Sequence, residues 1–405
     1  MLEQAGVEVT VLEAADRVGG RLRTDTVDGF LLDRGFQVLN PAYPAVRTVA
    51  DQDSLGLQPF GAGIGVRRDD DGGPPAVLAD PRREPGRLPA VLTSGMLHPG
   101  ELLPLARWAL PAVGLVHRLS GAPGHRLAAG ADRSRGATAA AAGVHGELGR
   151  VVEMFLRGVL LEADGSASTA FTRLLIRSFL LGTPGLPRAG MQAFPEQLAA
   201  RLRRPVVLGT PVEQVGPRLV RTAAGELRPD LVVLATGPTA AHDLLDRPPP
   251  RVKGCLTHWW AAETAPGDLD LLVVDGRPGR RGPVVNAAVV TNAAPSYAPA
   301  GRHLVQTTCL RDRTQPTDDE VRRHAGEVLG ADTSGWQLVR RDEVAEALPA
   351  QPPPLVTRSP MEVAPGLVVA GDHVDTASIQ GALVSGRRAA EGWLRRRGQR
   401  ARASS

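Results

Sequence analysis

One stretch near the N-terminus indicates the fold of this chain: Val9-Thr10-Val11-Leu12-Glu13-Ala14-Ala15-Asp16-Arg17-Val18-Gly19-Gly20-Arg21-Leu22-Arg23-Thr24. Its β-branched start extends back to Val7, so Val7–Glu13 predicts a strand, and the preceding Leu2–Gly6 reads as a last helical turn that ends at glycine. A helix end, a tight turn, a strand and a terminal acid are the second half of a βαβ unit. In dinucleotide-binding folds the acid in the place of Glu13 accepts hydrogen bonds from ribose hydroxyls.

Two adjacent glycines, Gly19 and Gly20, stand between Arg17 and Arg21 directly after this acid. Glycines allow backbone N–H groups to approach an anion closely, and flanking arginines add charge-assisted hydrogen bonds to phosphate oxygens. A glycine-rich surface turn with solvated arginines is the alternative. The position after a strand that ends in Glu13 favours the anion-binding interpretation.

The phosphate loop of such a fold, G-x-G-x-x-G, should lie about 20 residues before the acid, but only twelve residues precede Glu13. Gly61-Ala62-Gly63-Ile64-Gly65 does not replace it, because its spacing is wrong and its surroundings predict a β-hairpin. We expect an N-terminally truncated reading frame, with the true protein about 20–30 residues longer. The chain as written should then fold poorly or bind its cofactor weakly, because a missing central strand exposes two edges.

A second dinucleotide-type segment closes the chain. Leu367–Ala370 reads as a buried strand, Gly371-Asp372 ends it, and Ile379–Leu394 has apolar residues at helical spacing. An Asp at the carboxyl end of a parallel strand suits hydrogen bonding to a sugar-like polyol, and the following helix N-terminus suits an electron-rich ring edge. A helix N-cap is the alternative role for Asp372.

Five segments, taken in order, resemble the flavin-containing amine oxidase and phytoene desaturase-like superfamily: Val9–Thr24, Leu31–Leu39, Leu186–Leu198, Leu231–Gly237 and Gly366–Ala382. The resemblance covers almost the whole chain and implies bound FAD. Together with the motifs above, it places these residues at the cofactor: Glu13, Arg17, Gly19, Gly20, Arg21, Gly35, Phe36, Gln37, Val212, Gly371, Asp372, Ser378, Ile379, Gln380, Gly381 and Ala382. Val212 would contact adenine through its backbone, although a core valine explains that residue nearly as well.

The expected fold class is α/β, with a Rossmann-like FAD-binding domain built from discontinuous segments and an α+β substrate domain. The FAD-binding domain takes residues 1–60, 186–245 and 355–400, and the substrate domain takes 61–185 and 246–354. A basic tail over 396–405 is expected to be disordered.

Within the substrate domain, periodicity and a Thr317-x-x-Glu320 capping box predict several elements. The predicted helices are Glu147–Leu161, Ala167–Leu181 and one that opens at Thr317, and the predicted strands are Thr257–Ala262, Leu271–Asp275, Val284–Thr291 and His303–Leu310.

Amine oxidation is disfavoured, because the aromatic-cage tyrosine of the family's amine oxidases falls at Ser378 and only Tyr43 and Tyr297 exist. Some amine-oxidising members use a lysine near the flavin, and Lys253, the only lysine, is better explained as a surface residue. His258, His303 and His373 show no metal spacing, and no metal is expected; His373 is the histidine nearest the expected flavin. The sequence names no catalytic residue.

These observations favour an FAD-dependent oxidoreductase (a dehydrogenase, desaturase or oxidase) that removes a hydride from an apolar small molecule. A non-catalytic or FAD-deficient remnant that acts as a binding protein is the alternative, and a NAD-linked dehydrogenase is a weaker third hypothesis. Net charge +4 with dispersed arginines argues against a nucleic-acid partner, and two cysteines exclude a disulfide-dense fold.

The chain has no secretory signal and no apolar run of spanning length, so we expect a cytoplasmic protein without a transmembrane segment. Residues 102–119 form its most apolar stretch and leave a peripheral membrane contact open. The oligomeric state is left open as well.

Overall fold

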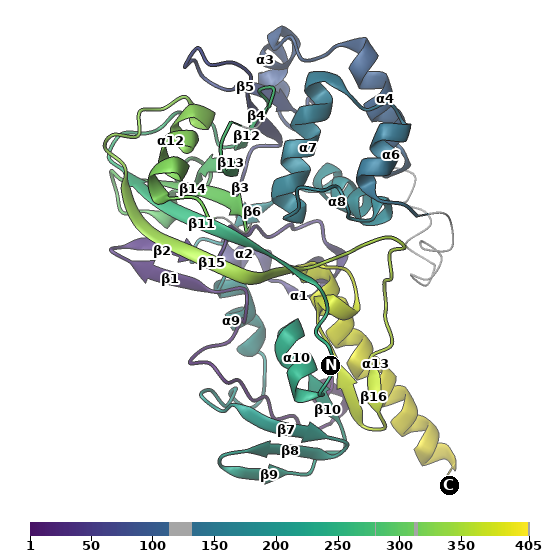
Figure 1. The fold of residues 1–405 in the computed structure, drawn as a ribbon. Coiled ribbons are helices and arrows are strands. Elements are labelled where there is room, and N and C mark those ends of the chain that lie inside the picture. Colours follow the sequence, from purple (N-terminus) through teal and green to yellow (C-terminus); the bar gives the residue numbers. More distant parts are fainter. Residues whose placement is uncertain (113–131, 280, 312–314, 404–405) are drawn as a thin grey trace.

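The computed structural model describes residues 1–112, 132–279, 281–311 and 315–403 of this chain. Its fold is mixed α/β, and Figure 1 shows two regions. A large sheet with the helices α3, α4, α6, α7, α8 and α12 occupies the upper region. Short sheets and the helices α9, α10 and α13 occupy the lower one.

The upper region is built on a seven-stranded sheet in the order β15-β11-β14-β13-β12-β4-β5. Neighbouring strands are antiparallel except for the parallel pair β12 and β4. Its strands are β4 (Gly63–Arg67), β5 (Ala76–Ala79), β11 (Val252–Ala262), β12 (Leu272–Asp275), β13 (Val284–Val289), β14 (His303–Leu310) and β15 (Gln337–Pro349). The chain therefore contributes to this sheet from two stretches that are far apart in sequence.

Both faces of this sheet are covered, which explains why every residue of β13 is buried. Successive strand residues point to opposite faces: Val273 packs in the cluster with Val321 and Ala325 of α12, and Val274 packs with Val151 of α7. The helices of this region are α3 (Leu88–Thr93), α4 (Pro99–Ala109), α6 (Arg135–Ala141), α7 (Gly146–Leu160), α8 (Thr169–Leu181) and α12 (Asp318–Leu329).

The structure confirms the elements that local pattern predicted in this region. The predicted helices correspond to α7, α8 and α12, and the predicted strands to β11, β12, β13 and β14. The capping box is present, because the Thr317 side chain accepts from Glu320 N and the Glu320 side chain accepts from Thr317 N. Gly63 begins a hairpin strand, β4, that pairs with β5. The apolar stretch 102–119 is helical in α4, and its part from residue 113 onward lies outside the described residues.

The lower region brings together segments from both ends of the chain. β10 (Val232–Leu234) pairs in parallel with β17 (Leu367–Val369), which also pairs with β16 (Glu362–Ala364). The other elements outside the large sheet are β1 (Thr24–Val27), β2 (Phe30–Asp33), α1 (Pro44–Val49), α2 (Gln52–Leu55), β3 (Gln58–Pro59), β6 (Gly185–Leu186), α9 (Ala193–Ala199), β7 (Val212–Gly216), β8 (Leu219–Thr222), β9 (Gly225–Leu227), α10 (Pro238–Leu244), α11 (Val290–Ala293) and α13 (Ile379–Ala403).

Two predictions about the chain ends differ from the structure. The expected strand Val7–Glu13 forms one parallel bridge, between Leu12 and Val207. Its backbone hydrogen bonds to Val207 and Thr210 are made by Val11 and Glu13, at its carboxyl end, whereas Val7 N donates to the nearby Leu2 carbonyl oxygen. The tail 396–405 is expected to be disordered, whereas α13 extends into it as far as Ala403. Arg, Ala and Gln are good helix formers, and a single glycine in this run does not stop the helix.

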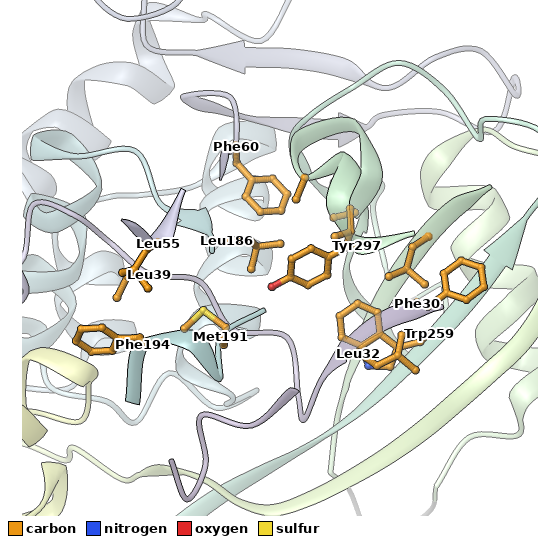
Figure 2. Close-up of a cluster of buried hydrophobic side chains, with 14 of the residues drawn as sticks. Phe30, Leu32, Leu39, Leu55, Phe60, Leu186, Met191, Phe194, Trp259 and Tyr297 are labelled. Atoms are coloured by element: carbon orange, nitrogen blue, oxygen red, sulfur yellow. The ribbon is translucent and has the colours of Figure 1, made fainter. Parts of the chain in front are cut away.

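The main apolar core joins the two regions. It contains Phe30 and Leu32 of β2, Leu186 of β6, and Trp259 of β11. Figure 2 shows Tyr297 among these side chains, with Leu186 and Met191 on one side and Leu32 and Trp259 on the other. This core holds the first strands of the lower region against the large sheet, and the candidate site lies beside it.

Candidate flavin and substrate site

A cavity of about 1230 Å³ is lined by residues of both regions. One group of lining residues comes from the glycine-rich segments of the lower region, including Gly19–Leu22, Gly35–Val38, Ala235–Gly237 and Gly371–Asp372. The other group consists mainly of apolar side chains of α7, α8 and the large sheet. The two groups meet where Gly35 approaches Val344 of β15. The site therefore has a polar, glycine-rich end and an apolar end.

The turn at Gly19 and Gly20 has the geometry of an anion-binding loop. Gly19 has φ +118°, and a Cβ there would lie 2.3 Å from the carbonyl oxygen of Leu22, so no other residue fits. Gly20 has φ +58°, and a Cβ there would meet nothing within 4 Å. Among the described residues, no acceptor binds the backbone N–H of Gly20 or of Arg21. The turn thus presents two unused donors beside the cavity.

Arg21 and Asp372, which are 351 residues apart, meet at the cavity wall. The Arg21 guanidinium donates to Asp372 Oδ1 at 2.5 Å and to the Ala347 carbonyl oxygen at 3.0 Å. Asp372 begins a short 3₁₀ turn after β17, and Ser378, rather than Asp372, precedes α13. An N-cap role of Asp372 for α13 is therefore excluded.

The start of α13 supplies further donors. Gly381 N donates to Ser378 Oγ, but no described acceptor binds the N–H groups of Ile379 and Gln380. The helix N-terminus carries a partial positive charge, so it stabilises an electron-rich group. Ile379 lines the cavity.

Most of the predicted cofactor residues lie at this cavity. Eleven of the sixteen line it: Gly19, Gly20, Arg21, Gly35, Phe36, Gln37, Gly371, Asp372, Ser378, Ile379 and Ala382. Glu13, Arg17, Val212, Gln380 and Gly381 are not part of the lining.

The side chains of three of these five make hydrogen bonds elsewhere. Arg17 donates to the Thr24 carbonyl oxygen and pairs with Asp25, so its guanidinium is engaged away from the cavity. The Glu13 carboxylate accepts from Ala15 N at 2.9 Å, and the Gln380 side chain accepts from Ala45 N at 2.8 Å.

Two titratable side chains at the cavity, those of Cys255 and Tyr43, are held neutral. Burial raises the pKa of the Cys255 thiol to about 11 and that of the Tyr43 phenol to about 12. At neutral pH Cys255 is therefore no thiolate nucleophile. Burial also lowers the pKa of His373, but this imidazole packs edge-on against His242 and is not part of the lining.

Lys253 is not the solvated surface lysine that was expected. Its side chain is 15% exposed, and its Nζ donates to Glu162 Oε2 at 2.5 Å. It does not line the cavity. Lys253 belongs to a buried charge network rather than to either of the two roles considered for it.

The sequence motifs missed the polar residues of the apolar end. Cys255, Asn286 and Thr308 line the cavity from β11, β13 and β14. One signal was available, since Asn286 is the single amide in the apolar run Val284–Val289. Strand pairing, which the sequence does not display, is what brings it beside Thr308.

The residues at the polar end fit an FAD group. The unused N–H groups of Gly20 and Arg21 suit phosphate oxygens, and the open space at Gly20 and Gly237 leaves room for a close ligand. The Asp372 carboxylate suits a polyol, and the start of α13 suits a flavin ring edge. Within the described residues, no group of three or more His, Cys, Asp or Glu side chains could hold a metal ion. No helix there is long and apolar enough to cross a bilayer.

Comparison with solved structures identifies the fold. An oxidoreductase from Methanosarcina mazei aligns with a TM-score of 0.68 at 16% identity, over 96% of each chain. Putrescine oxidase bound to putrescine aligns with a TM-score of 0.68 at 17% identity, over 97% of this chain and 95% of that one. A fatty acid isomerase from P. acnes that produces CLA aligns with a TM-score of 0.60 at 15% identity, over 97% and 94%. At these identities the likeness concerns the fold alone.

A sequence model of one family covers nearly all of the chain. The model described as flavin-containing amine oxidoreductase matches residues 1–392. The match includes both glycine-rich segments at the polar end of the cavity and the strands at its apolar end. This chain therefore belongs to the flavin-containing amine oxidoreductase family.

Proposed function

We propose that the protein is an FAD-dependent oxidoreductase that removes a hydride from an apolar small molecule. The family supports an oxidoreductase with a flavin. The observation that carries the finer proposal is the division of one cavity into a glycine-rich end with free backbone donors and an end with apolar walls. Such a cavity suits a flavin nucleotide beside an apolar substrate.

When bound, FAD supplies the redox chemistry by accepting the hydride. Gly20, Arg21 and Asp372 would hold its polar parts, and the start of α13 would face its ring. Phe155 of α7 and Phe179 of α8 pack edge to face with their ring centroids 5.5 Å apart, and they form part of the apolar wall. These side chains exclude water and orient the substrate.

Gly237 offers a clean test of where the cofactor lies. It lines the cavity with φ −57°, and a Cβ there would meet nothing within 4 Å. Gly237→Val should therefore leave the apo fold intact but occupy the space of a ligand. We expect FAD affinity to fall by about tenfold or more, the effect of roughly 1.4 kcal/mol of binding free energy.

The visible absorption spectrum of the purified chain after incubation with FAD measures this affinity. Gly335→Val is the matched control, because a Cβ at Gly335 also meets nothing within 4 Å and Gly335 is not part of the lining. Anaerobic bleaching of the flavin by apolar alcohols and hydrocarbons then tests hydride removal. A chain that stays colourless with FAD would contradict the proposal and favour the binding-protein alternative.

A further inference from the structure

Asn286 carries a buried amide that has no partner among the described residues. The residue is 4% exposed and lines the cavity from β13, and its side chain makes no hydrogen bond to any described residue. Its Oδ1 is fully buried and unpaired. Buried polar groups in folded proteins are nearly always hydrogen-bonded, and an unpaired one destabilises the fold. The stability of this protein alone does not explain an amide at this position.

Thr308 lies directly beside Asn286. The two residues are partners in the β13–β14 register, so their side chains share one face of the sheet. Thr308 Oγ1 accepts from Gln306 Nε2 at 2.5 Å. A hydroxyl that accepts in this way still has its own proton to donate. The pair therefore offers one free hydroxyl donor and one free amide to the cavity.

Helix α7 has a glycine, Gly158, where it packs against this amide. A Cβ at Gly158 would lie 2.2 Å from Asn286 Nδ2 and 3.3 Å from its Cγ. Glycine inside a helix costs about 0.5–1 kcal/mol relative to alanine, so the helix gives up stability where the amide is seated. Gly158 also lines the cavity.

The surroundings of the pair are apolar or neutral. Phe155, Leu175 and Ile176 line the same end of the cavity, and the neighbouring Cys255 is a neutral thiol. The charged lining residues belong to other segments, namely Arg21, Arg34, Asp80, Arg82, Arg83 and Asp372. Asp80 follows β5, which lies three strands away from β13 in the sheet. A cationic group at Asn286 would be desolvated without a carboxylate to pair with.

We propose that Asn286 and Thr308 form a neutral polar anchor for a hydroxyl group on an otherwise apolar substrate. A hydroxyl donates to the amide oxygen and accepts from the Thr308 hydroxyl or the amide nitrogen, so it satisfies groups that the fold leaves unpaired. The inference rests on the proposed function, because it names the substrate class of that site. The site should therefore bind a neutral alcohol more tightly than either a hydrocarbon or a primary ammonium ion.

Three six-carbon probes, cyclohexanol, cyclohexane and cyclohexylamine, test the anchor by titration calorimetry at neutral pH. The measurement is made with and without FAD, so a failure of flavin binding and a failure of the anchor are seen separately. The wild-type chain should bind cyclohexanol about tenfold more tightly than cyclohexane, as expected for one or two net hydrogen bonds. Cyclohexylamine, a cation at this pH, should bind more weakly than the alcohol.

Three variants test which residues produce the preference for cyclohexanol over cyclohexane. Asn286→Leu should abolish it, and Thr308→Val should reduce it. Gly158→Ala should weaken it by displacing the amide. Thr307→Val is the control on the opposite face of β14, where Thr307 Oγ1 accepts from Trp260 Nε1, and it should keep the preference.

A second measurement separates an anchor from a structural amide. If Asn286 serves the ligand, Asn286→Leu leaves the midpoint of thermal unfolding of the ligand-free chain unchanged or higher, because an unpaired polar group is removed. A lower midpoint, an equal affinity of the wild type for cyclohexanol and cyclohexane, stronger binding of cyclohexylamine, or no measurable binding of cyclohexanol would each overturn the proposal.

Discussion

Asp33 and Glu162 are both buried carboxyl groups next to the cavity wall, yet their partners differ in kind. Asp33, at the end of β2, accepts from the Thr24 hydroxyl, Met191 N and the Tyr297 hydroxyl. Among the described residues no cation contacts its carboxylate. Glu162, after α7, accepts instead from the Arg135 guanidinium at 2.7 Å and from Lys253 Nζ at 2.5 Å.

The two carboxyl groups show how each region stabilises a buried acid. Burial raises the pKa of Asp33 to about 6, so this carboxyl gains a proton readily. The groups that donate to it carry no charge, so they can keep their hydrogen bonds when it is protonated. Glu162 and Arg135 are 3% and 2% exposed, and Arg135 also pairs with Glu153. Removing one ion from such a network leaves its partners charged and shielded from water. The lower region uses a neutral hydrogen-bond site, and the upper region an ionic one.

The largest effect is expected from Arg135→Met. The variant should lose about 3–5 kcal/mol of unfolding free energy, because Glu162 is left buried with one cation fewer. Urea denaturation at neutral pH measures the loss. Arg204→Met is the control, since Arg204 and its partner Glu8 are 60% and 72% exposed, and it should change little. A loss in Arg135→Met as small as that of the control would show that the network adds nothing to stability.

Asp33→Asn should change how stability depends on pH. The folded-state pKa of about 6 lies above the ordinary value of 3.8, so the folded state binds the proton more tightly. The contribution of Asp33 to the unfolding free energy is therefore highest below about pH 4, and it decreases by about 3 kcal/mol as the pH rises through about 6. The variant lacks this contribution.

Denaturant unfolding at about pH 4 and about pH 7 gives the comparison. The stability of the variant relative to wild type should rise between these two values, while titration of all other groups cancels in the difference. A constant difference would mean that Asp33 stays ionised in the fold at both pH values.

The smallest effect is expected from Tyr297→Phe, which removes the 2.9 Å hydrogen bond from the Tyr297 hydroxyl to Asp33 Oδ2. We expect a loss of about 1–3 kcal/mol at neutral pH. The loss should be smaller at acid pH, since a protonated carboxyl accepts more weakly. Tyr43→Phe is the matched control, because the Tyr43 hydroxyl makes no hydrogen bond to a described residue, and thermal unfolding compares the two variants. Equal losses in both variants would assign the effect to removal of a hydroxyl in itself rather than to its hydrogen bond with Asp33.

Local pattern was sufficient for several elements of the upper region. Apolar periodicity marked α7 and α8, and the Thr317–Glu320 capping box marked the start of α12, because such signals depend only on neighbours along the chain. Eleven of the sixteen proposed cofactor residues line one cavity, since strand ends and glycine turns carry the binding geometry of this fold. The pairing of Arg17 with Asp25 was not predictable, because a guanidinium's partner depends on side-chain geometry.

The order of the glycine-rich segments, and with it the family and the polar end of the cavity, follows from the sequence alone, because turns and strand ends are encoded by short runs of residues. The residues at the apolar end are instead brought together by the packing of distant segments. Asn286 meets Thr308 through strand register, and Gly158 makes room through the packing of α7 on the sheet. Lys253, which is expected at the surface, pairs with Glu162 because of the same kind of packing between distant segments. Contacts between residues that are distant in sequence depend on how the elements pack, which local sequence does not specify.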